Sequence, residues 1–303
     1  MKGVIQMPAD YKPFDKKEWL RLEKKAHELR TLTCQTVKWA GSGHIGGGLS
    51  CLDALTVLYH RYMKYDVQNP KWDDRDRFVL SKGHAAISYA PVLVDLGFMP
   101  LDELKIFNLT GAKIGMHLDS NKVVGVDCST GSLGHGPSIA VGMALAARLK
   151  KKDYMTFCIT GDGELNEGSN WEAFMSASQF KLSNLVIMVD NNKLMIDGPV
   201  ADEMAVEPLD ERFGSFGFNT IRVDGQNIKE LCMALEQAID NNNNGGDKPT
   251  AIIMDTVKGA GVDFIEGDYT WHYGSLSDEM FDKAFASLEK YYEKRVARAK
   301  KEG

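Results

Sequence analysis

The sequence predicts an α/β fold built on a doubly wound, mainly parallel sheet flanked by helices. Two patterns lead to this class: apolar runs typical of buried strands alternate with amphipathic helical stretches, and glycines gather in short loops between them. A third observation, 44% hydrophobic and 26% charged residues in a chain of 303, excludes disordered and low-complexity classes. Because no internal repeat or domain boundary is visible, residues 1–303 are expected to form a single domain.

The first half of the chain is expected to be mainly helical. Residues 15–40 place apolar side chains at three- and four-residue spacing, which predicts an amphipathic helix ending at the glycine-rich break Gly41–Gly48. A second helix is expected through residues 52–62, and Arg77–Leu80 is a candidate strand. After two further helical stretches, the loop Ser129–Gly136 leads into a helix of small residues.

From residue 140 onward, strands alternate with helices. The expected strands are the apolar runs Met155–Thr160, Leu185–Val189, Thr220–Val223 and Ala251–Thr256. The expected helices are Ala140–Leu149, Trp171–Phe180, Ile228–Ile239 and a tail that begins at Asp278. The polar stretch Asn241–Gly246 predicts a surface turn. This alternation indicates strands that run parallel within one sheet.

Charge and cysteine content exclude several classes of function. The formal net charge of −6 argues against a surface that coats nucleic acid. No apolar run approaches the ~18 residues of a membrane span, and Met1–Trp19 shows no secretory signal. The five cysteines form no CxxC pair, which argues against a disulfide framework or zinc ribbon. A reducing, cytoplasmic location is therefore expected.

The strongest chemical motif is Gly161-Asp162-Gly163, followed about thirty residues later by Asp190-Asn191-Asn192. Each motif follows an apolar strand, and open α/β sheets bind ligands at the carboxyl ends of their strands. A carboxylate, an amide oxygen and nearby carbonyls suit Mg²⁺ or Ca²⁺ rather than zinc or copper. The flanking glycines allow a diphosphate to approach the backbone closely. A Gly-Asp-Gly triplet alone is a common turn, but this pair of motifs is typical of thiamine diphosphate sites.

The chain resembles the N-terminal, diphosphate-binding half of transketolase. The resemblance runs through six segments in the family's order: Ser42–Gly47, Asp74–Ala85, Ser129–Gly136, Gly161–Gly168, Val189–Gly198 and Val257–Gly274. It implies the family's thiamine diphosphate-binding fold. Several independent motifs in the same order make chance agreement improbable.

The resemblance implies where the cofactor and its metal would bind. The side chains of Asp162 and Asn192 and the carbonyl of Leu194 correspond to ligands of Mg²⁺, which Ca²⁺ or Mn²⁺ could replace. The residues expected to contact thiamine diphosphate are His84, Gly131, Leu133, Gly161, Asp162, Gly163, Asn192, Ile196 and His272.

Histidines correspond to the catalytic groups of this family. The resemblance implies that His44 and His117 hold the donor sugar and help proton transfer, with His272 lining the pocket beside them. Imidazole suits this chemistry because it titrates near neutral pH. The chain departs from the family at Ile45, which replaces a proline, and at Met116–Leu118, where the family usually has Gly-His-Pro.

The resemblance also implies a partner. A complete transketolase is roughly twice this length, and its second half carries the pyrimidine-binding domain. The chain is thus expected to be one subunit of a split transketolase that pairs with a C-terminal subunit, in a complex with two copies of each. Glu167 corresponds to an acidic residue that links two active sites across the subunit interface. Sugars or sugar phosphates are the expected substrates.

Several alternatives stay open at this point. Transfer of a two-carbon ketol unit between pentose phosphates is the default activity, but split relatives also act on apulose phosphate or sulfo-sugars. The alpha subunit of a two-oxoacid dehydrogenase decarboxylase carries a similar pair of motifs, and half of a deoxyxylulose phosphate synthase is less favoured. A non-catalytic diphosphate-binding module would leave the loop histidines without a role.

Overall fold

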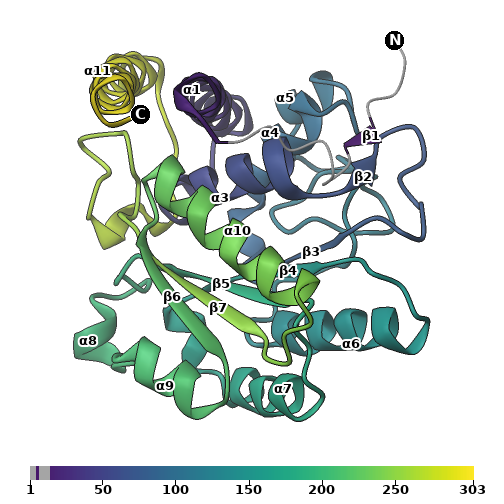
Figure 1. Cartoon of the computed structure of the whole chain (residues 1–303). Helices are drawn as coiled ribbons and strands as arrows, with labels where there is room; N and C mark the ends of the chain where they lie inside the picture. Colours follow the sequence, from purple (N-terminus) through teal and green to yellow (C-terminus); the bar gives the residue numbers. More distant parts are fainter. Residues whose placement is uncertain (1–4, 7–13) are drawn as a thin grey trace.

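The computed structural model describes residues 5–6 and 14–303. Most of the N-terminal stretch, where no secretory signal is expected, lies outside these residues. Within the described part, five parallel strands form the main sheet in the order β3-β4-β5-β7-β6 (Figure 1). The strands are β3 (Arg77–Leu80), β4 (Thr156–Gly161), β5 (Leu185–Asn191), β6 (Asn219–Asp224) and β7 (Thr250–Asp255). The predicted fold class is confirmed.

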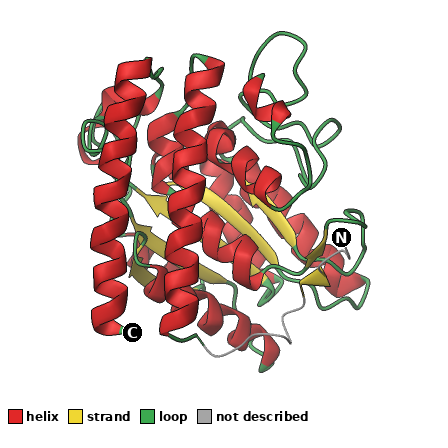
Figure 2. Ribbon diagram, turned by 90° about the horizontal axis from the view of Figure 1, so that it is seen from above, coloured by secondary structure: helices red, strands yellow, loops and turns green. Residues whose placement is uncertain are grey.

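Helices cover both faces of this sheet, as Figures 1 and 2 show. One face carries α1 (Lys16–Ala40), α3 (Leu52–Val57), α4 (Ala86–Asp95), α10 (Ile228–Asn243) and α11 (Asp278–Glu302). The other face carries α6 (His135–Leu149), α7 (Gly168–Gln179), α8 (Val200–Glu203) and α9 (Leu209–Ser215). Short elements complete the chain: β1 (Ile5–Gln6), paired with β2 (Tyr65–Asp66), α2 (Ile45–Ser50), the π-helical turn η2 (Leu58–Tyr62) and α5 (Asp102–Lys105).

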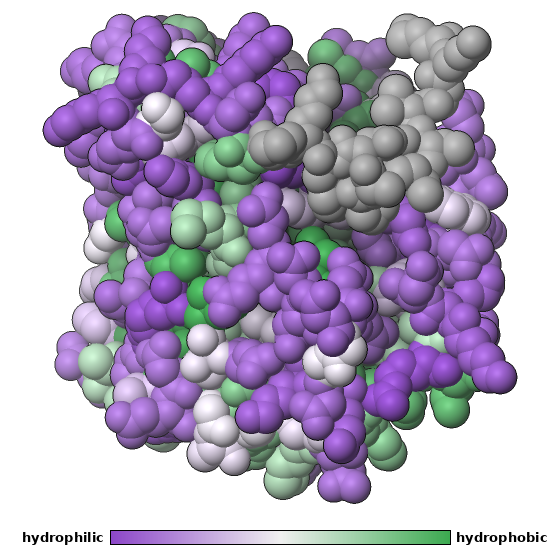
Figure 3. Space-filling model, viewed as in Figure 1, coloured by the Kyte–Doolittle hydropathy of each residue, from purple (hydrophilic) through white to green (hydrophobic). Residues whose placement is uncertain are grey.

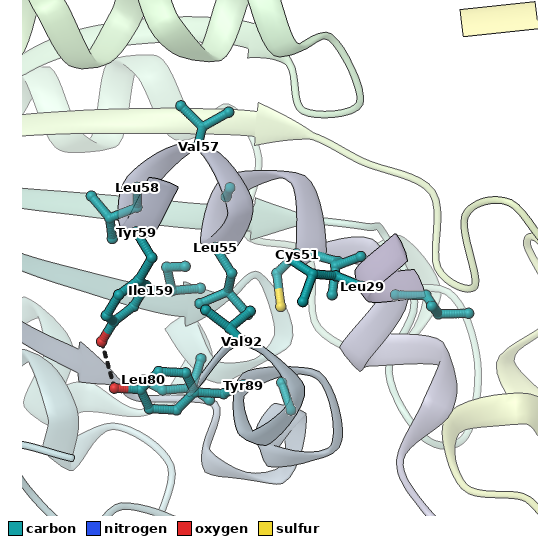
Figure 4. Packing of buried hydrophobic residues seen from close by; sticks show 14 of the residues in the cluster. Leu29, Cys51, Leu55, Val57, Leu58, Tyr59, Leu80, Tyr89, Val92 and Ile159 are labelled. Atoms are coloured by element: carbon teal, nitrogen blue, oxygen red, sulfur yellow. Dashed lines mark hydrogen bonds between the residues drawn. The ribbon is translucent and has the colours of Figure 1, made fainter. Parts of the chain in front are cut away.

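Side chains that alternate along each strand build two apolar layers. Phe157 and Ile159 of β4 face the core beneath α1, α3 and α4, whereas Cys158 between them faces the core beneath α6 and α7. In the first core, Leu55 lies close to Val92, and the Tyr59 hydroxyl is hydrogen-bonded to that of Tyr89 (Figure 4). The cover on both faces is what a parallel sheet requires, because neither face can be left exposed to water.

The glycine-rich segment differs from its prediction as a plain break. Ile45–Gly48 is helical and forms the start of α2, which packs against α4 and against the segment around Trp271. A Cβ atom on Gly46 would lie 2.6 Å from the carbonyl oxygen of Trp271, and one on Gly48 would lie 2.6 Å from Ser88 Oγ. These glycines therefore serve close packing of a helix rather than chain reversal alone.

The polar turn at Asn241–Gly246 also differs from its prediction. Helix α10 continues through Asn243, and Gly245 then reverses the chain with φ +77°. The Asn241 amide donates to the carbonyl of Lys248 at 3.0 Å, which ties the helix end to the segment before β7. Asparagine is a weak helix former, and here tertiary contacts override its propensity.

The face of the molecule that Figure 3 shows is largely polar. Hydrophobic side chains appear on it in small patches, across the middle and along the lower edge. Within residues 5–6 and 14–303, no helix combines the length and apolar character needed for a bilayer crossing.

A buried ion-pair network joins α1, α3 and α11. The Asp53 carboxylate accepts hydrogen bonds from Arg30 at 3.0 and 2.6 Å and from Arg295 at 2.8 and 3.0 Å. Glu23 accepts a further bond from Arg295. The side chains of Asp53 and Glu23 are fully buried. The positive charges of the Arg30 and Arg295 guanidiniums are therefore balanced by these two carboxylates.

Substituting alanine for Asp53 should lower the free energy of unfolding by about 3–5 kcal/mol, because two buried guanidiniums lose their main counter-charge. Urea unfolding followed by circular dichroism measures the change. The matched control is Glu279→Ala, which breaks an exposed pair with Lys283 at 2.7 Å and should cost less than about 1 kcal/mol. Equal losses in both variants would contradict the assignment of the network as a stabilising contact.

Candidate active site

The ends of β4 and β5 bring the expected metal ligands together. Because Gly161 pairs with Asp190 in the sheet, Asp162 and Asn192 follow neighbouring strands at the same edge. The Asp162 carboxylate accepts hydrogen bonds from the backbone N–H of Gly163, at 2.8 Å, and of Lys193, which lies between Asn192 and Leu194. The structure thus places all three expected ligands in one pair of adjoining loops.

Asp190 is a fully buried carboxylate next to these expected ligands. It accepts hydrogen bonds from Lys82 Nζ and Thr256 Oγ1, and from Ser50 Oγ at 2.6 Å. The Asn192 amide nitrogen also donates to it at 3.3 Å. This contact assigns the amide orientation of Asn192, since the nitrogen faces Asp190 and the oxygen Oδ1 faces the Leu194 N–H at 3.1 Å. Three other segments of the chain therefore converge on this carboxylate through Ser50, Lys82 and Thr256.

Histidines from four segments gather beside this carboxylate. His44 precedes α2, His84 lies in the 3₁₀ turn η3 (Gly83–Ala85), and His272 lies in the 3₁₀ turn η5 (Tyr269–His272). The ring centroid of His44 lies 5.2 Å from those of His84 and His272, and 6.4 Å from that of His117. His117 stays exposed at the rim, on the loop after α5. The structure therefore brings the predicted histidines into one cluster.

Glycines allow these loops to approach one another. Gly43 and Gly274 form an antiparallel bridge with hydrogen bonds of 2.9 and 3.0 Å, which joins the segment before His44 to the segment after His272. Gly131 has φ +149°, and a Cβ atom there would lie 2.8 Å from the His117 ring. Any side chain at Gly131 would thus strain the backbone and displace the imidazole.

Burial keeps the central histidines neutral. It lowers the pKa of His44 to about 4, with smaller contributions from the charges of His117, Lys82 and Lys258. It lowers the pKa of His272 to about 3, where Lys258 adds the next contribution. His44 Nδ1 is buried and has no hydrogen-bond partner among residues 14–303. A neutral imidazole with an unpartnered nitrogen can accept or donate a proton to a ligand.

Nuclear magnetic resonance can test this protonation state directly. The ring resonances of His44 and His272 are expected to titrate near pH 4 and pH 3, below the ordinary histidine value of 6.5. Both rings are then uncharged in the folded chain at neutral pH, because they become protonated only well below pH 6.5. His44→Gln and His272→Gln variants assign the two signals, and midpoints near 6.5 would refute the shifts.

Two lysines, Lys82 and Lys258, complete the site, although the motifs do not mark either of them as functional. Lys258 is buried, and its Nζ lies 2.7 Å from the Met195 carbonyl oxygen, 3.3 Å from that of Leu194 and 3.1 Å from His272 Nδ1. Burial, with the nearby charge of Lys82, lowers the pKa of Lys258 to about 8. Both lysines lie inside family motifs. Their burial is what indicates a functional role, and burial cannot be read from the sequence. Positive charge here suits a phosphorylated ligand.

Other expected contacts lie at the rim. Leu133 is 37% exposed and Ile196 is 61% exposed, and Glu167 is exposed at the start of α7. A Cβ atom on Gly163 would lie 2.9 Å from Met195 Cγ, so a side chain at this position would require Met195 to move. The chain by itself does not bring Leu133, Ile196 and Glu167 into contact with the histidine cluster. Their exposure leaves them available to a ligand or to another subunit.

No group of three or more His, Cys, Asp or Glu side chains in the described ranges is placed to hold a metal ion. The expected set differs in kind from such a group, because it contains a single carboxylate together with an amide and a backbone carbonyl. These are hard oxygen donors, the type that Mg²⁺ takes while it keeps other positions for phosphate and water.

Known proteins share this sequence and architecture. Residues 22–290 match the family of the transketolase thiamine diphosphate-binding domain. The chain is 40% identical to the 6-deoxy-6-sulfo-D-fructose transketolase subunit of Clostridium sp. (strain MSTE9), over 89% of this chain and 96% of that protein. It is 37% identical to an apulose-4-phosphate transketolase subunit of Phocaeicola vulgatus, over 90% and 95% of the two chains.

Larger relatives are matched over part of their length. The chain is 38% identical to the transketolase of Homo sapiens, over 93% of this chain and 44% of that one. A crystal structure of a Pichia stipitis transketolase variant superposes with a TM-score of 0.82 and 29% identity, over 92% and 44% of the chains. The crystal structure of the Campylobacter jejuni transketolase superposes with a TM-score of 0.80 and 31% identity, over 92% of this chain and 48% of that one.

Proposed function

This chain belongs to the transketolase family, and from that membership we propose that it is one subunit of a split transketolase. Such an enzyme transfers a two-carbon ketol unit from a ketose to an aldose. The observation that carries the proposal is the meeting of His44, His84, His117 and His272 beside the Asp162 and Asn192 loops. A diphosphate-binding module without catalysis would need no such cluster of neutral imidazoles.

The residues present fit thiamine diphosphate and a magnesium ion. Asp162, Asn192 and the Leu194 carbonyl would hold the metal, and Lys258 and His84 would face the diphosphate. Burial, with the negative charge of Asp190, raises the pKa of Asp162 to about 6, and a bound cation would oppose that shift. When bound, thiamine diphosphate supplies the carbon nucleophile and the electron sink of the reaction.

The histidines would handle the protons of the sugar. Ketol transfer requires protons to leave and return to hydroxyl groups near the reacting carbonyl, and a neutral imidazole can perform both steps. His44, with its unpartnered Nδ1, and His117 at the rim would hold the donor hydroxyls. A charged Lys258 donates to His272 Nδ1, which leaves the Nε2–H of His272 as a donor toward the ligand.

A second chain would complete the active site. The relatives from Clostridium and Phocaeicola are named as subunits, and the chain covers nearly all of each. We therefore assign the partner role to a C-terminal transketolase subunit, with two copies of each chain in the complex. Exposed Leu133, Ile196 and Glu167 at the site rim support this arrangement. The five free cysteines fit a cytoplasmic location.

The names of these relatives also bear on substrate class. Sulfofructose and apulose 4-phosphate are ketoses other than xylulose 5-phosphate, so an unusual ketose is a candidate donor beside it. Such donors share the ketol end, which the histidine cluster would contact. They differ at the far end, which this chain's described contacts do not specify.

Ketol transfer by the reconstituted complex tests the proposal. The chain is assayed with thiamine diphosphate and Mg²⁺, with and without the transketolase C-terminal subunit encoded beside it. Donors are xylulose 5-phosphate, 6-deoxy-6-sulfofructose and apulose 4-phosphate, with ribose 5-phosphate or glyceraldehyde 3-phosphate as acceptor. Activity is expected in the mixture alone. Full activity of the chain without a partner would refute the split enzyme, and failure of the mixture to bind thiamine diphosphate would refute the site.

A further inference from the structure

A buried carboxylate lies directly behind the proposed cofactor site. Glu164 is 3% exposed and belongs to the 3₁₀ turn η4 (Gly163–Asn166), immediately after the Gly161-Asp162-Gly163 motif. Its Oε1 accepts hydrogen bonds from Ser81 Oγ and from the Gly134 N–H at 2.9 Å. Its Oε2 accepts one from the Gly161 N–H at 3.0 Å. A single side chain thus joins the ends of β3 and β4 to the segment before α6.

Gly134 is the last residue of loop 129–134. The first part of this loop is also attached to β3. Thr130 Oγ1 donates to the Leu80 carbonyl at 2.5 Å. A Cβ atom on Gly83 would lie 2.8 Å from the Thr130 carbonyl carbon, so the loop lies directly against the chain that follows β3. Thr130 therefore holds the near end of loop 129–134, and Glu164 holds the far end through Gly134.

The contacts of Glu164 require a carboxylate rather than an amide. Two backbone N–H groups and a hydroxyl donate to it, and they are distributed over both of its oxygens. A glutamine has one oxygen, so its NH₂ group would face either Gly161 N–H or Gly134 N–H. Neither backbone group can turn away, and one buried donor would lose its acceptor.

We propose that Glu164 is a positioning residue that holds loop 129–134 in place to contact the ring end of the cofactor. The loop presents Gly131 beside the His117 ring and the half-exposed Leu133 toward the site rim. Other segments carry the residues that would contact the diphosphate of the cofactor or its metal ion: Asp162, Asn192 and Lys258. The assignment of the ligand rests on the proposed function, whereas the hold of Glu164 on the loop rests on the hydrogen bonds alone.

Hydrogen–deuterium exchange on the full chain without cofactor tests the hold on the loop. In Glu164→Gln, amides of residues 129–136 should exchange about tenfold faster than in the unsubstituted chain, because glutamine cannot accept from Gly134 and Gly161 together and its hold on the loop weakens. The matched control is Glu172→Gln, at an exposed position on α7, and it should leave this segment unchanged. Should Glu164→Gln fail to fold, Ser81→Ala removes one donor only and should give a smaller rise confined to the same segment. Unchanged exchange at residues 129–136 in both variants overturns the proposal.

Ligand binding then separates positioning from general damage to the site. Glu164→Gln should weaken thiamine diphosphate with Mg²⁺ about tenfold and leave inorganic pyrophosphate with Mg²⁺ unchanged, because pyrophosphate lacks the rings that the loop would contact. Equal weakening of both ligands, or of neither, overturns the positioning role. If the unsubstituted complex binds neither ligand, the proposed function fails, and the exchange result still decides whether Glu164 holds the loop.

Discussion

Replacing Asp162 with alanine is expected to reduce ketol transfer by at least about 10³-fold, the equivalent of about 4 kcal/mol. Asp162 is the single carboxylate of the proposed metal-binding set, and it is buried between Gly163 and Lys193. Without it, the Asn192 oxygen and one carbonyl would have to hold a divalent cation beside the buried charge of Lys82. The metal and the diphosphate should both bind far more weakly.

Calorimetric titration of the reconstituted complex with Mg²⁺ and thiamine diphosphate, together with the transfer assay, measures this effect. Asp202→Ala is the matched control, because Asp202 is an exposed carboxylate on α8 and is not among the proposed metal ligands. It should retain full cofactor affinity. Tight cofactor binding by Asp162→Ala would contradict the assignment of this carboxylate as a metal ligand.

Replacing His44 with alanine should lower kcat for ketol transfer by about 10²–10⁴-fold, the range associated with loss of a general acid–base. His44 lies at the centre of the histidine cluster, and its buried Nδ1 has no partner in the described chain. Cofactor affinity should change little, because the diphosphate contacts are assigned to Lys258, His84 and the metal ligands. The loss should therefore appear in kcat rather than in cofactor binding.

Steady-state kinetics at saturating thiamine diphosphate and Mg²⁺ provide the measurement. His27→Ala is the matched control: His27 lies on α1, stacks on Tyr292 at 4.5 Å between ring centroids and pairs with Glu289 at 3.1 Å. Its removal should leave kcat unaltered. A His44→Ala variant that loses cofactor binding in proportion to its activity would show that His44 supports the cofactor instead of the sugar.

Most of the fold can be predicted from local patterns in the chain. The predicted strand Arg77–Leu80 forms β3 with the same bounds, and the tail from Asp278 forms α11. Strand β5 extends two residues beyond its predicted end at Val189 and carries Asp190 into the sheet. Pairing with β7 causes this extension, and hydropathy could not reveal it because Asp190 and Asn191 are polar. Boundaries thus depend on neighbours that are distant in sequence.

The candidate site could be predicted in part. Asp162, Asn192 and the loop histidines stand in motifs that the chain displays openly, and the structure brings them together. Glu164, Lys82 and Lys258 also stand in these motifs, but their importance lies in burial. A charged residue is ordinarily exposed, and its sequence neighbours do not reveal whether it is enclosed by loops from elsewhere.

By itself, the sequence determined the fold class, the order of the strands along the chain and the residue types available for a diphosphate site. These follow from periodicity and from short motifs, which are local properties. The tertiary structure alone decided that Asp190 binds three remote segments, that Glu164 holds loop 129–134, and that burial makes His44 neutral. Each of these depends on desolvation or on donors from remote segments, and both arise only when the chain has packed.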